Sequence, residues 1–479
     1  MGLAAELAPY LDAHPGLSAV AMLKHGPVAL LARAALADLA SETIDVQYYI
    51  YEEDLAGTLL TVHLLEAADR GVRIRVLLDD NNLSGPDLAL RLLDAHPLVE
   101  VRVFNTYRWR SRWLRPLELL LHFDRLQRRM HNKIFAVDGC CGIFGGRNIG
   151  SNYFDADERE NFADFDVFVA GSLISAACRS FDDYWNHPLA VPAEALSARR
   201  MSADEVAVGM RRLRHRLQAL QSLEERHDRA RATLISMLED PDRAMTWARA
   251  EFVVDPPSKL TDPDAPSPVL ERLATLWDQA GSEALIESAY FVPGVEGAEF
   301  IERQVQEGVH TRILTNSLAA NDVTAVHVGY ARYRRRLLRA GIELFEYQRT
   351  ATRESMDLRL TGGPSGASLH AKVAVFDRRI TWVGSFNLDP RSARLNSELA
   401  IIIHDEGLAR SSALLIERDL EPDRAWRVTM EPGALRQRLV WDGEKAGRPR
   451  RVWHEPDATV GQRLLVRLLS LWPGVERLL

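Results

Sequence analysis

The feature that most constrains this chain is a short polar pattern that occurs twice. The pattern H-x-K-x4-D begins at His131 and again at His370. A turn that contains glycine follows each copy, and it carries an asparagine 17 positions after the histidine. Two copies with the same offset are not expected by chance, so they indicate a duplicated unit. The polar residues of the two copies are His131, Lys133, Asp138 and Asn148, and His370, Lys372, Asp377 and Asn387.

A strand, a helix, a glycine and a second strand precede each copy. In both places an alternating segment is followed by helical spacing, and the glycine comes just before another apolar segment. Short connections of this kind predict that the two strands of each unit pair in parallel, as in an α/β fold. The predicted elements are 41–50, 54–70 and 72–78 in the first half, and 282–291, 295–307 and 309–315 in the second.

The chain between the halves predicts where the domains divide. Residues 192–240 have helical spacing and are rich in Ala, Leu, Arg and Glu. Residues 255–268 hold five prolines, which is typical of an extended linker. We therefore expect an N-terminal helical extension (1–40), a first lobe (41–190), a helical insert and linker (191–268), a second lobe (269–417), and a C-terminal extension with an amphipathic helix (418–479).

Composition excludes several classes of protein. Lys and Arg total 59 against 67 Asp and Glu, and a net charge of −8 argues against a non-specific nucleic-acid binder. The three cysteines form neither a disulfide framework nor a metal-binding spacing. The longest apolar run, 26–39, is interrupted by Arg33 and Asp38, so no transmembrane helix is predicted. Because no zinc-type spacing or Walker glycine loop occurs, we expect no essential metal and no cofactor.

The repeated histidine and lysine suit phosphoryl chemistry. Because side chains alternate along a strand, His131 and Lys133 project on one face, and so do His370 and Lys372. Transfer of a phosphodiester needs a nucleophile, a proton donor for the leaving oxygen, and cations beside the phosphate. One neutral imidazole can attack phosphorus while the other, protonated, donates to the departing alkoxide. Two such pairs that meet at a pseudo-two-fold axis supply all of these groups.

Further polar residues are candidates for supporting roles. Amide hydrogens of Asn148 and Asn387 and the hydroxyl of Ser385 can donate to phosphate oxygens. A carboxylate behind each imidazole would fix its orientation. We expect Glu398 to do this in the second half, and Asp164 or Asp166 in the first.

The aspartates of the two motifs allow two interpretations. Asp138 and Asp377 each precede a turn. They are candidate catalytic residues because they belong to the motif. A structural role, in capping the turn or anchoring a neighbour, agrees equally well with their position.

The chain resembles the phospholipase D superfamily, whose hallmark is the duplicated H-x-K-x4-D motif. Within it, several phrases look like those of the bacterial C-type cardiolipin synthases, the segment 389–398 above all. The resemblance implies an α/β fold of two pseudo-symmetric lobes, each a mixed, mainly parallel sheet flanked by helices, with the active site at their interface. The other phrases are 44–50, 77–81, 129–133, 145–150, 315–320 and 462–473.

The resemblance also implies an activity. A phosphatidyl group would move from phosphatidylglycerol or phosphatidylethanolamine onto a histidine, and then onto the hydroxyl of a phosphatidylglycerol to form cardiolipin. By analogy His131 is the nucleophile and His370 the acid, although the symmetry of the motifs permits the reverse. The halves differ where Gly146 stands in the first and Ser385 in the second, as they do in the C-type group.

Phospholipid substrates imply contact with a membrane surface. We expect a peripheral protein of the bacterial inner membrane, with the leaflet and the oligomeric state open and no nucleic-acid partner. Candidate contact segments are 107–122, 28–39 and 463–479, which mix arginine with leucine, tryptophan or both. Each could instead pack on the core, with its arginines reaching solvent.

Three rival functions remain open at this stage. Water could replace the lipid acceptor, which would make the protein a phospholipase D-type phosphodiesterase. A nuclease is disfavoured by the acidic composition. A catalytically silent lipid-binding scaffold is disfavoured because His, Lys and Asn are intact in both motifs.

Overall fold

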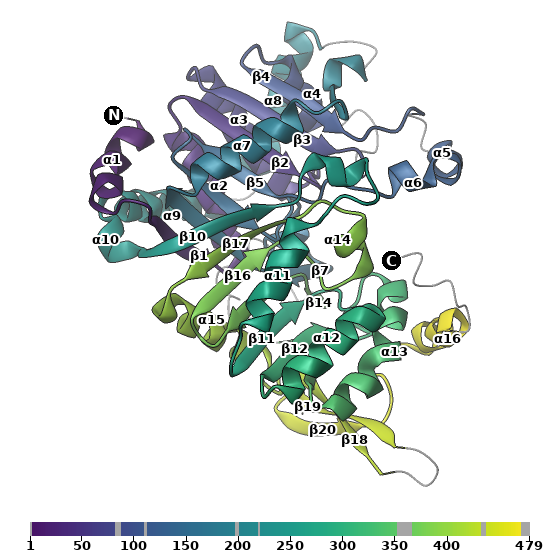
Figure 1. Cartoon of the computed structure of the whole chain (residues 1–479). Coiled ribbons are helices and arrows are strands. Elements are labelled where there is room, and N and C mark those ends of the chain that lie inside the picture. The colour runs from purple at the N-terminus through teal and green to yellow at the C-terminus, as the bar shows by residue number, and fades with distance from the viewer. Residues whose placement is uncertain are drawn as a thin grey trace.

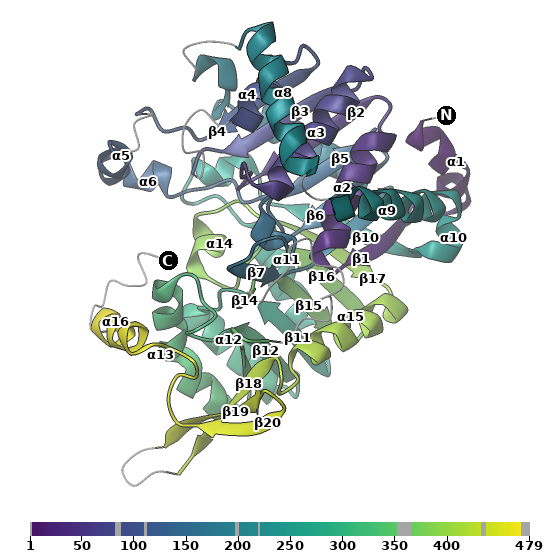
Figure 2. The same cartoon turned by 180° about the vertical axis from the view of Figure 1, so that it is seen from behind.

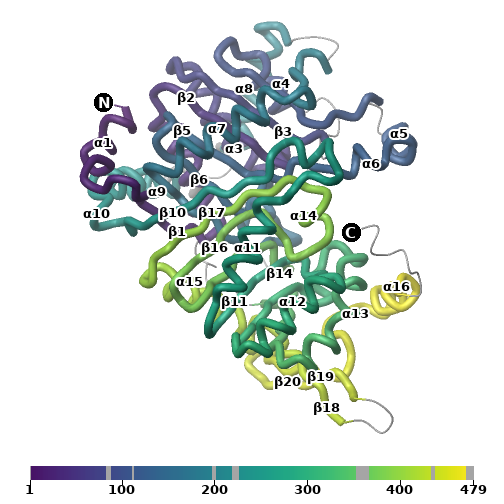
Figure 3. The backbone as a smooth tube through the Cα atoms, viewed as in Figure 1, coloured from purple at the N-terminus to yellow at the C-terminus, as the bar shows by residue number. Residues whose placement is uncertain are grey.

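One sheet of 18 strands runs through both lobes of the molecule. This is seen in a computed structural model that describes residues 2–81, 88–109, 113–196, 201–218, 221–351, 366–432 and 437–470 (Figures 1 and 3). In the first lobe the strands follow one another as β9 (Ala190–Pro192), β4 (Val99–Phe104), β3 (Arg73–Asp79), β2 (Thr43–Tyr48), β5 (Ile134–Val137), β6 (Cys141–Gly145), β8 (Asp166–Gly171) and β1 (Ser18–Leu23).

The second lobe repeats this order from the shared centre outward. Its strands are β10 (Thr246–Val254), β17 (Leu399–His404), β16 (Ile380–Gly384), β15 (Lys372–Phe376), β11 (Glu283–Ser288), β12 (His310–Asn316), β13 (Glu343–Tyr347), β18 (Ala425–Glu431), β19 (Arg438–Lys445) and β20 (Arg448–Val452). The two-lobed α/β architecture predicted from the duplicated motif is therefore confirmed.

The direction of the strands corrects one detail of that prediction. β2, β3 and β4 are parallel, and so are β11, β12 and β13, as the strand–helix–strand units require. The remaining described pairings of the large sheet are antiparallel. The sheet is mixed, but it is not mainly parallel, because the motif strands β5 and β15 each turn back through a tight hairpin.

The first strand–helix–strand unit shows how local sequence sets these boundaries. Helix α3 (Leu55–Asp69) begins where the Asp54 side chain accepts a hydrogen bond from the Gly57 N–H at 3.1 Å. It ends before Gly71, whose φ of 104° lies in the left-handed region that glycine adopts readily. Leu60 and Leu64 of this helix are fully buried in the apolar core of the first lobe. Ile313 and Leu337 belong to a separate core in the second lobe.

Helices cover the faces of both halves of the sheet (Figures 1 and 2). The first lobe carries α1 (Leu3–Ala13), α2 (Gly26–Leu39), α3, α4 (Leu88–Ala95), α7 (Ile174–Trp185), α8 (Ala203–Gln218) and α9 (Gln221–Glu239), and the short α10 (Pro241–Ala244) leads into β10. The second carries α11 (Pro268–Asp278), α12 (Gly294–Gln306), α13 (Thr324–Ala340) and α15 (Glu406–Asp419). Among the described residues, no helix has both the length and the apolar character needed to cross a bilayer.

The two lobes meet at strands that the sequence interpretation had placed in helical segments. β1 pairs antiparallel with β10, with Ala19 opposite Trp247, and each continues the sheet of its own lobe through β8 or β17. The expected helical extension (1–40) and helical insert (191–268) therefore each supply a strand as well as helices. A short apolar run such as Ser18–Leu23 has no period that separates strand from helix.

Helix α2 is part of the core and not a membrane contact. All of its residues from Ala29 to Ala37 are buried, including Arg33, which is 1% exposed. The Arg33 guanidinium donates to the Tyr48 hydroxyl and to Asp166 Oδ2, both at 2.9 Å. Of the two alternatives for residues 28–39, the structure therefore shows packing on the core and not membrane contact.

Replacement of Arg33 tests this role of the N-terminal segment. Arg33→Met leaves Asp166 with one cation fewer in a buried site, so we expect the free energy of unfolding to fall by about 3–5 kcal/mol. Urea unfolding followed by circular dichroism measures the change. Arg249→Met on β10, where the side chain is 74% exposed, is the matched control and should shift it by less than about 0.5 kcal/mol. Equal stability of both variants would contradict the assignment.

Candidate active site

Both motif histidines lie at the junction of the lobes, where each is held by backbone of the other lobe. His131 stands just before β5, and its N–H donates to the Ser397 carbonyl of the second lobe at 2.9 Å. His370 stands between β14 (Gly366–Leu369) and β15, and its N–H donates to the Ala163 carbonyl of the first lobe at 2.7 Å. Next to His370, β14 of the second lobe pairs in parallel with β7 (Glu160–Ala163) of the first lobe (Figure 1).

Each imidazole is also bound by a carboxylate from the opposite lobe. His131 Nδ1 lies 2.8 Å from Glu398 Oε2, and His370 Nδ1 lies 2.6 Å from Asp164 Oδ2. We had expected each carboxylate to lie behind the imidazole of its own half, and that pairing is wrong. The segment that carries Glu398 runs beside His131, and the segment that carries Asp164 runs beside His370. Each carboxylate therefore contacts the histidine of the opposite lobe.

Asp166 is not one of the orienting carboxylates. Its Oδ2 accepts from Arg33 at 2.9 Å, and its Oδ1 accepts from the Arg147 N–H at 3.3 Å. It therefore anchors α2 and the motif turn within the first lobe. Of the two aspartates proposed for the first half, only Asp164 lies at an imidazole.

The lysines lie beside the histidines, as strand alternation predicts. Lys133 Nζ donates to the His131 carbonyl at 2.6 Å, and Lys372 Nζ donates to the carbonyl of His370. Both lysines are 2% exposed or less, and both imidazoles are 7% exposed. The four cationic or ionisable groups of the two motifs therefore share one buried site.

The difference between Gly146 and Ser385 has a steric reason. A Cβ at Gly146 would come within 2.3 Å of Asp164 Oδ1, so the first lobe has no room for a side chain there. In the second lobe the longer Glu398 leaves room for Ser385, whose hydroxyl donates to Glu398 Oε2 at 2.5 Å. Ser385 therefore contacts the orienting carboxylate, and the phosphate-binding role expected for it stays a prediction.

Glu398 has further partners that the sequence interpretation missed. The Ser392 hydroxyl donates to Glu398 Oε1 at 2.8 Å, and the Glu398 N–H donates to Asp255 at 3.2 Å. Asp255 in turn accepts from the buried Lys259 Nζ at 2.6 Å. The prolines beside Asp255 indicated an extended linker. The spacing of Asp255 and Lys259, four positions apart, was the signal in the sequence that could have predicted this ion pair.

The two motif asparagines are buried at the same junction. Asn148 Oδ1 accepts from the Ile50 N–H at 3.2 Å, and its Nδ2 donates to the Tyr153 hydroxyl at 2.9 Å. The Tyr153 ring meets the His370 ring edge-on at 5.0 Å between centroids. Within the described part of the chain, Asn387 Oδ1 has no hydrogen-bond partner.

Aromatic rings form walls beside both imidazoles. Tyr49 meets His131 edge-on with ring centroids 5.1 Å apart. Phe162 lies 5.3 Å from His370, on the strand that also leads to Asp164. These rings limit the access of water to the two histidines, and sequence spacing alone did not single them out.

Burial makes this site unfavourable for positive charge. It lowers the pKa of His131 to about 4, although the Glu398 charge acts in the opposite direction. The pKa of Lys133 falls to about 7 for the same reason. Burial and the charges of Lys372 and Lys133 hold the pKa of His370 well below its ordinary value, and burial also lowers the pKa of Lys372. An anion placed among these groups would reverse the effect.

The two orienting carboxylates differ in their electrostatics. Burial raises the pKa of Asp164. Burial also acts to raise the pKa of Glu398, but the charge and hydrogen bond of His131 outweigh it, and the pKa lies below its ordinary value. The imidazoles of the two lobes therefore face carboxylates of different basicity.

The motif aspartates lie at the other end of their strands from the histidines. Asp138 accepts from the backbone N–H groups of Ser41, Glu42 and Thr43, and Asp377 from those of residues 281–283, at 2.8–2.9 Å. Both have φ near 50°, a left-handed turn that aspartate tolerates. The structure does not bring them to the active site, and each instead anchors the neighbouring segment that leads into β2 or β11, which supports the structural alternative over the catalytic one.

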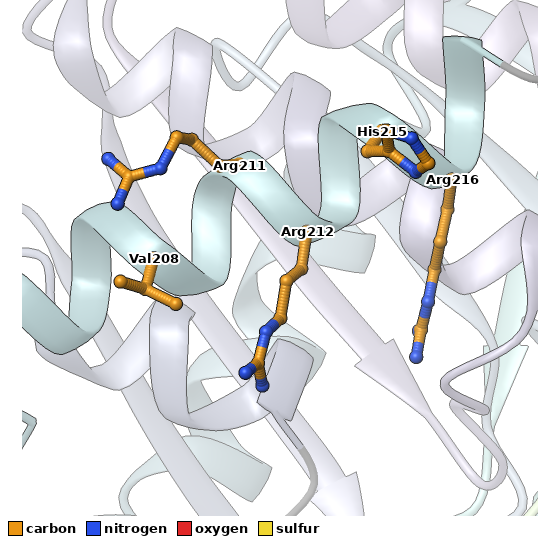
Figure 4. Close-up of a pocket in the computed structure, with 5 residues that line it drawn as sticks. All are labelled: Val208, Arg211, Arg212, His215 and Arg216. Atoms are coloured by element: carbon orange, nitrogen blue, oxygen red, sulfur yellow. The ribbon is translucent and has the colours of Figure 1, made fainter.

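A basic hollow on the first lobe is separate from this site. It lies along α8 and is lined by Val208, Arg211, Arg212, His215 and Arg216 (Figure 4). Arg216 also pairs with Glu53 at 3.0 Å. None of the motif residues lines this hollow.

Comparisons with known proteins agree with the two-lobed arrangement. Residues 34–185 and 273–420 match the family described as "Cardiolipin synthase, PLD-like domain". The chain is 40% identical to cardiolipin synthase C of Escherichia coli (strain K12), over 100% of this chain and 99% of the relative. It is 26% identical to cardiolipin synthase B of the same strain, over 81% and 79% of the two chains.

A solved structure has a similar fold. The phosphatidylserine synthase of Haemophilus influenzae Rd KW20 superimposes with a TM-score of 0.59 over 99% of this chain and 98% of that chain. Its sequence is 13% identical, so the similarity concerns the fold.

Removal of the Asp377 carboxylate separates anchoring of the neighbouring segment from catalysis. Asp377→Ala should lower the free energy of unfolding by about 1–2 kcal/mol because three backbone N–H groups lose their acceptor. Turnover of a phosphodiester substrate, measured on folded protein, should stay within about twofold. A tenfold loss of turnover at unchanged stability would instead restore the catalytic interpretation.

Removal of the charge of each orienting carboxylate tests the crossed pairs. Asp164→Asn and Glu398→Gln should each lower kcat by about 10²–10⁴-fold with little change in KM, because the imidazole loses the group that fixes its tautomer. Steady-state kinetics measures both. The control is Glu251→Gln, which alters a glutamate 2.6 Å from His404 outside the site. If all three variants behave alike, the crossed pairs have no special role.

Proposed function

The chain belongs to the cardiolipin synthase family of phospholipase D-like enzymes, and we propose that it forms cardiolipin by phosphatidyl transfer through a phosphohistidine. The observation that carries the mechanism is the pair of buried histidines at the lobe junction. In each, Nδ1 is occupied by a carboxylate, which leaves Nε2 for the reaction. A neutral imidazole held in this way is a competent nucleophile.

In the first step His131 attacks the phosphorus of a phospholipid. A nitrogen–phosphorus bond forms and the bond to the headgroup oxygen breaks, while His370 donates a proton to the departing alkoxide. The donor lipid is phosphatidylglycerol or phosphatidylethanolamine, and glycerol or ethanolamine leaves. In the second step the hydroxyl of a phosphatidylglycerol gives its proton to His370 and displaces His131 from phosphorus.

The charge of the substrate completes the site. In the absence of an anion, burial lowers the pKa of both lysines and both imidazoles. A bound phosphodiester raises these values, so Lys133 and Lys372 become the cations beside its oxygens and one imidazole can hold the proton of the acid. We propose that the amides of Asn148 and Asn387, which are buried, donate to the same oxygens.

Transfer to a lipid hydroxyl competes with hydrolysis, and the outcome depends on how well the site excludes water. His131 and His370 are each 7% exposed, and aromatic rings flank both. Exclusion of water protects a phosphohistidine from hydrolysis until the second lipid hydroxyl arrives. These rings therefore favour transfer over hydrolysis.

Two short amphipathic elements supply a surface for the membrane. The first comprises α5 (Arg115–Leu121) and α6 (Phe123–Leu126), and the second is α16 (Val460–Ser470). In both views of the molecule these helices project from the same side (Figures 1 and 2). Residues 110–112 and 471–479 of the expected contact segments lie outside the described residues. The exposed apolar residues are Trp113 and Leu114 just before α5, Leu117, Leu120, Leu121 and Phe123 in the first element, and Val460, Leu464, Leu465 and Leu468 in the second.

These helices are connected to the segments that carry the catalytic groups. α6 ends at Leu126, five positions before His131. Gln462 of α16 donates to the Leu318 carbonyl, just beyond β12, and Asn316 at the end of that strand donates to the Leu369 carbonyl beside His370. We therefore propose peripheral docking of this side on the bacterial inner membrane, with the phospholipid entering between the two elements.

Lipid mass spectrometry on purified protein tests the reaction. With phosphatidylglycerol vesicles, with and without phosphatidylethanolamine, we expect cardiolipin from the intact chain and a fall of at least about 10³-fold in His131→Ala and His370→Ala. Dependence on phosphatidylethanolamine would identify it as the donor. Phosphatidic acid without cardiolipin would contradict transfer and indicate hydrolysis.

Trapping of the phosphoenzyme assigns the two histidines. After acid-free quenching, a lipid–phosphohistidine adduct should be found on His131 in His370→Ala and be absent from His131→Ala. An adduct that persists in His131→Ala would reverse the two roles.

Charge placed on the exposed apolar helices tests the docking surface. Leu120→Asp combined with Leu464→Asp should reduce sedimentation with phosphatidylglycerol vesicles by about tenfold or more, because two residues lose apolar contact with the lipid. Turnover of a water-soluble short-chain phospholipid should change little. Leu414→Asp on α15, where the leucine is 63% exposed, is the control. Undiminished binding of the double variant would reject this surface.

A further inference from the structure

Two histidines and an aspartate from three helices converge on the first lobe, away from the catalytic junction. Asp38 belongs to α2, His63 to α3 and His227 to α9. His63 Nδ1 lies 2.7 Å from Asp38 Oδ1, and His227 Nε2 lies 3.1 Å from Asp38 Oδ2. One possible ligand atom from each residue lies within 4.8 Å of the other two.

We propose that these three residues bind a divalent transition-metal cation of the zinc type. Two imidazole nitrogens and one carboxylate oxygen are the donor set that zinc prefers when three protein ligands leave a fourth position open. Ligand atoms around a tetrahedral zinc ion are about 3.3 Å apart. His63 lies 2.7 Å from one oxygen of the Asp38 carboxylate and His227 lies 3.1 Å from the other, so a rotation of the carboxylate and a shift of the imidazoles would be needed to bring three ligand atoms to this spacing.

The geometry and exposure of the cluster suit a metal site. The Asp38 carboxylate faces a nitrogen of each imidazole, so all three residues direct a possible ligand atom to the same place. The side chains are 12–18% exposed, so a water molecule can reach the fourth position.

The nearby guanidinium of Arg70 binds backbone carbonyls and not the Asp38 carboxylate. Arg70 Nη2 donates to the backbone carbonyls of Ala37 and Asp38, at 2.7 Å and 3.0 Å, and so holds the end of α2. The two imidazole rings face each other with centroids 4.5 Å apart, tilted by 37°. Both rings therefore present a nitrogen to the same carboxylate.

A metal ion here would join the insert between the lobes to the first lobe. α9 lies in that insert and packs along α2 (Figure 2). The three ligands are far apart in the sequence, at positions 38, 63 and 227, so no local spacing could reveal them. A tie between α9 and the α2–α3 pair is a structural role, distinct from the phosphoryl chemistry, in which we expect no metal.

Metal binding to the intact chain tests the proposal. Protein stripped with EDTA is dialysed against Zn²⁺, and bound zinc is counted by elemental analysis. Co²⁺ serves as a spectroscopic probe, because a four-coordinate site gives intense visible absorption. We expect about one ion per chain with a Kd in the micromolar range or below, and a rise in Tm of about 2 °C or more on addition of Zn²⁺.

Matched variants locate the ion. His227→Gln and Asp38→Asn should each weaken binding by at least about tenfold and abolish the Tm shift. His96→Gln, which alters a histidine 3.3 Å from Asp69 that has no third possible ligand among the described residues, should bind normally. His131→Ala should also bind normally, which excludes the catalytic histidines as the source.

The opposite results are equally informative. Absence of bound zinc and of the cobalt spectrum in the intact chain would overturn the proposal and leave the cluster as an ion-paired contact between helices. Binding that survives in His227→Gln, with folding verified by circular dichroism, would overturn it as well.

Discussion

The exchange of carboxylates between the lobes is the interaction on which the active site depends. His131 of the first lobe is oriented by Glu398 of the second, and His370 of the second by Asp164 of the first. The residue that precedes each carboxylate, Ser397 or Ala163, also accepts a hydrogen bond from the backbone N–H of the same histidine. Separation of the lobes would therefore break both imidazole–carboxylate contacts and both backbone hydrogen bonds of the histidines at once. One chain that carries both halves keeps the partners together.

Much of this arrangement could be predicted from local patterns. The duplicated motif identified both histidines, both lysines and the strand–helix–strand units, because these depend on periodicity and short spacing. The crossing of Glu398 and Asp164 could not be predicted, since it depends on contacts between residues more than 200 positions apart. β1 was missed because a short apolar run lacks a decisive period, and Asp255 because prolines dominate its surroundings.

The electrostatics of the site connect substrate charge to catalysis. Two lysines and two imidazoles are buried around only two orienting carboxylates, and burial lowers the pKa of all four basic groups. The four basic groups therefore hold their positive charge only when a phosphate anion is bound among them. Aromatic rings then serve two purposes, because they exclude water and deepen the desolvation that makes the anion necessary.

The Gly146 and Ser385 positions make the two halves inequivalent. Glu398 accepts hydrogen bonds from two serine hydroxyls, whereas Asp164 lies against a glycine that leaves no room for such a donor. The pKa of Glu398 lies below its ordinary value and that of Asp164 above it. A centre with perfect two-fold symmetry has no means of distinguishing attack from protonation. Here the surroundings of Asp164 and Glu398 differ, so the two histidines are not interchangeable even though their motifs are identical.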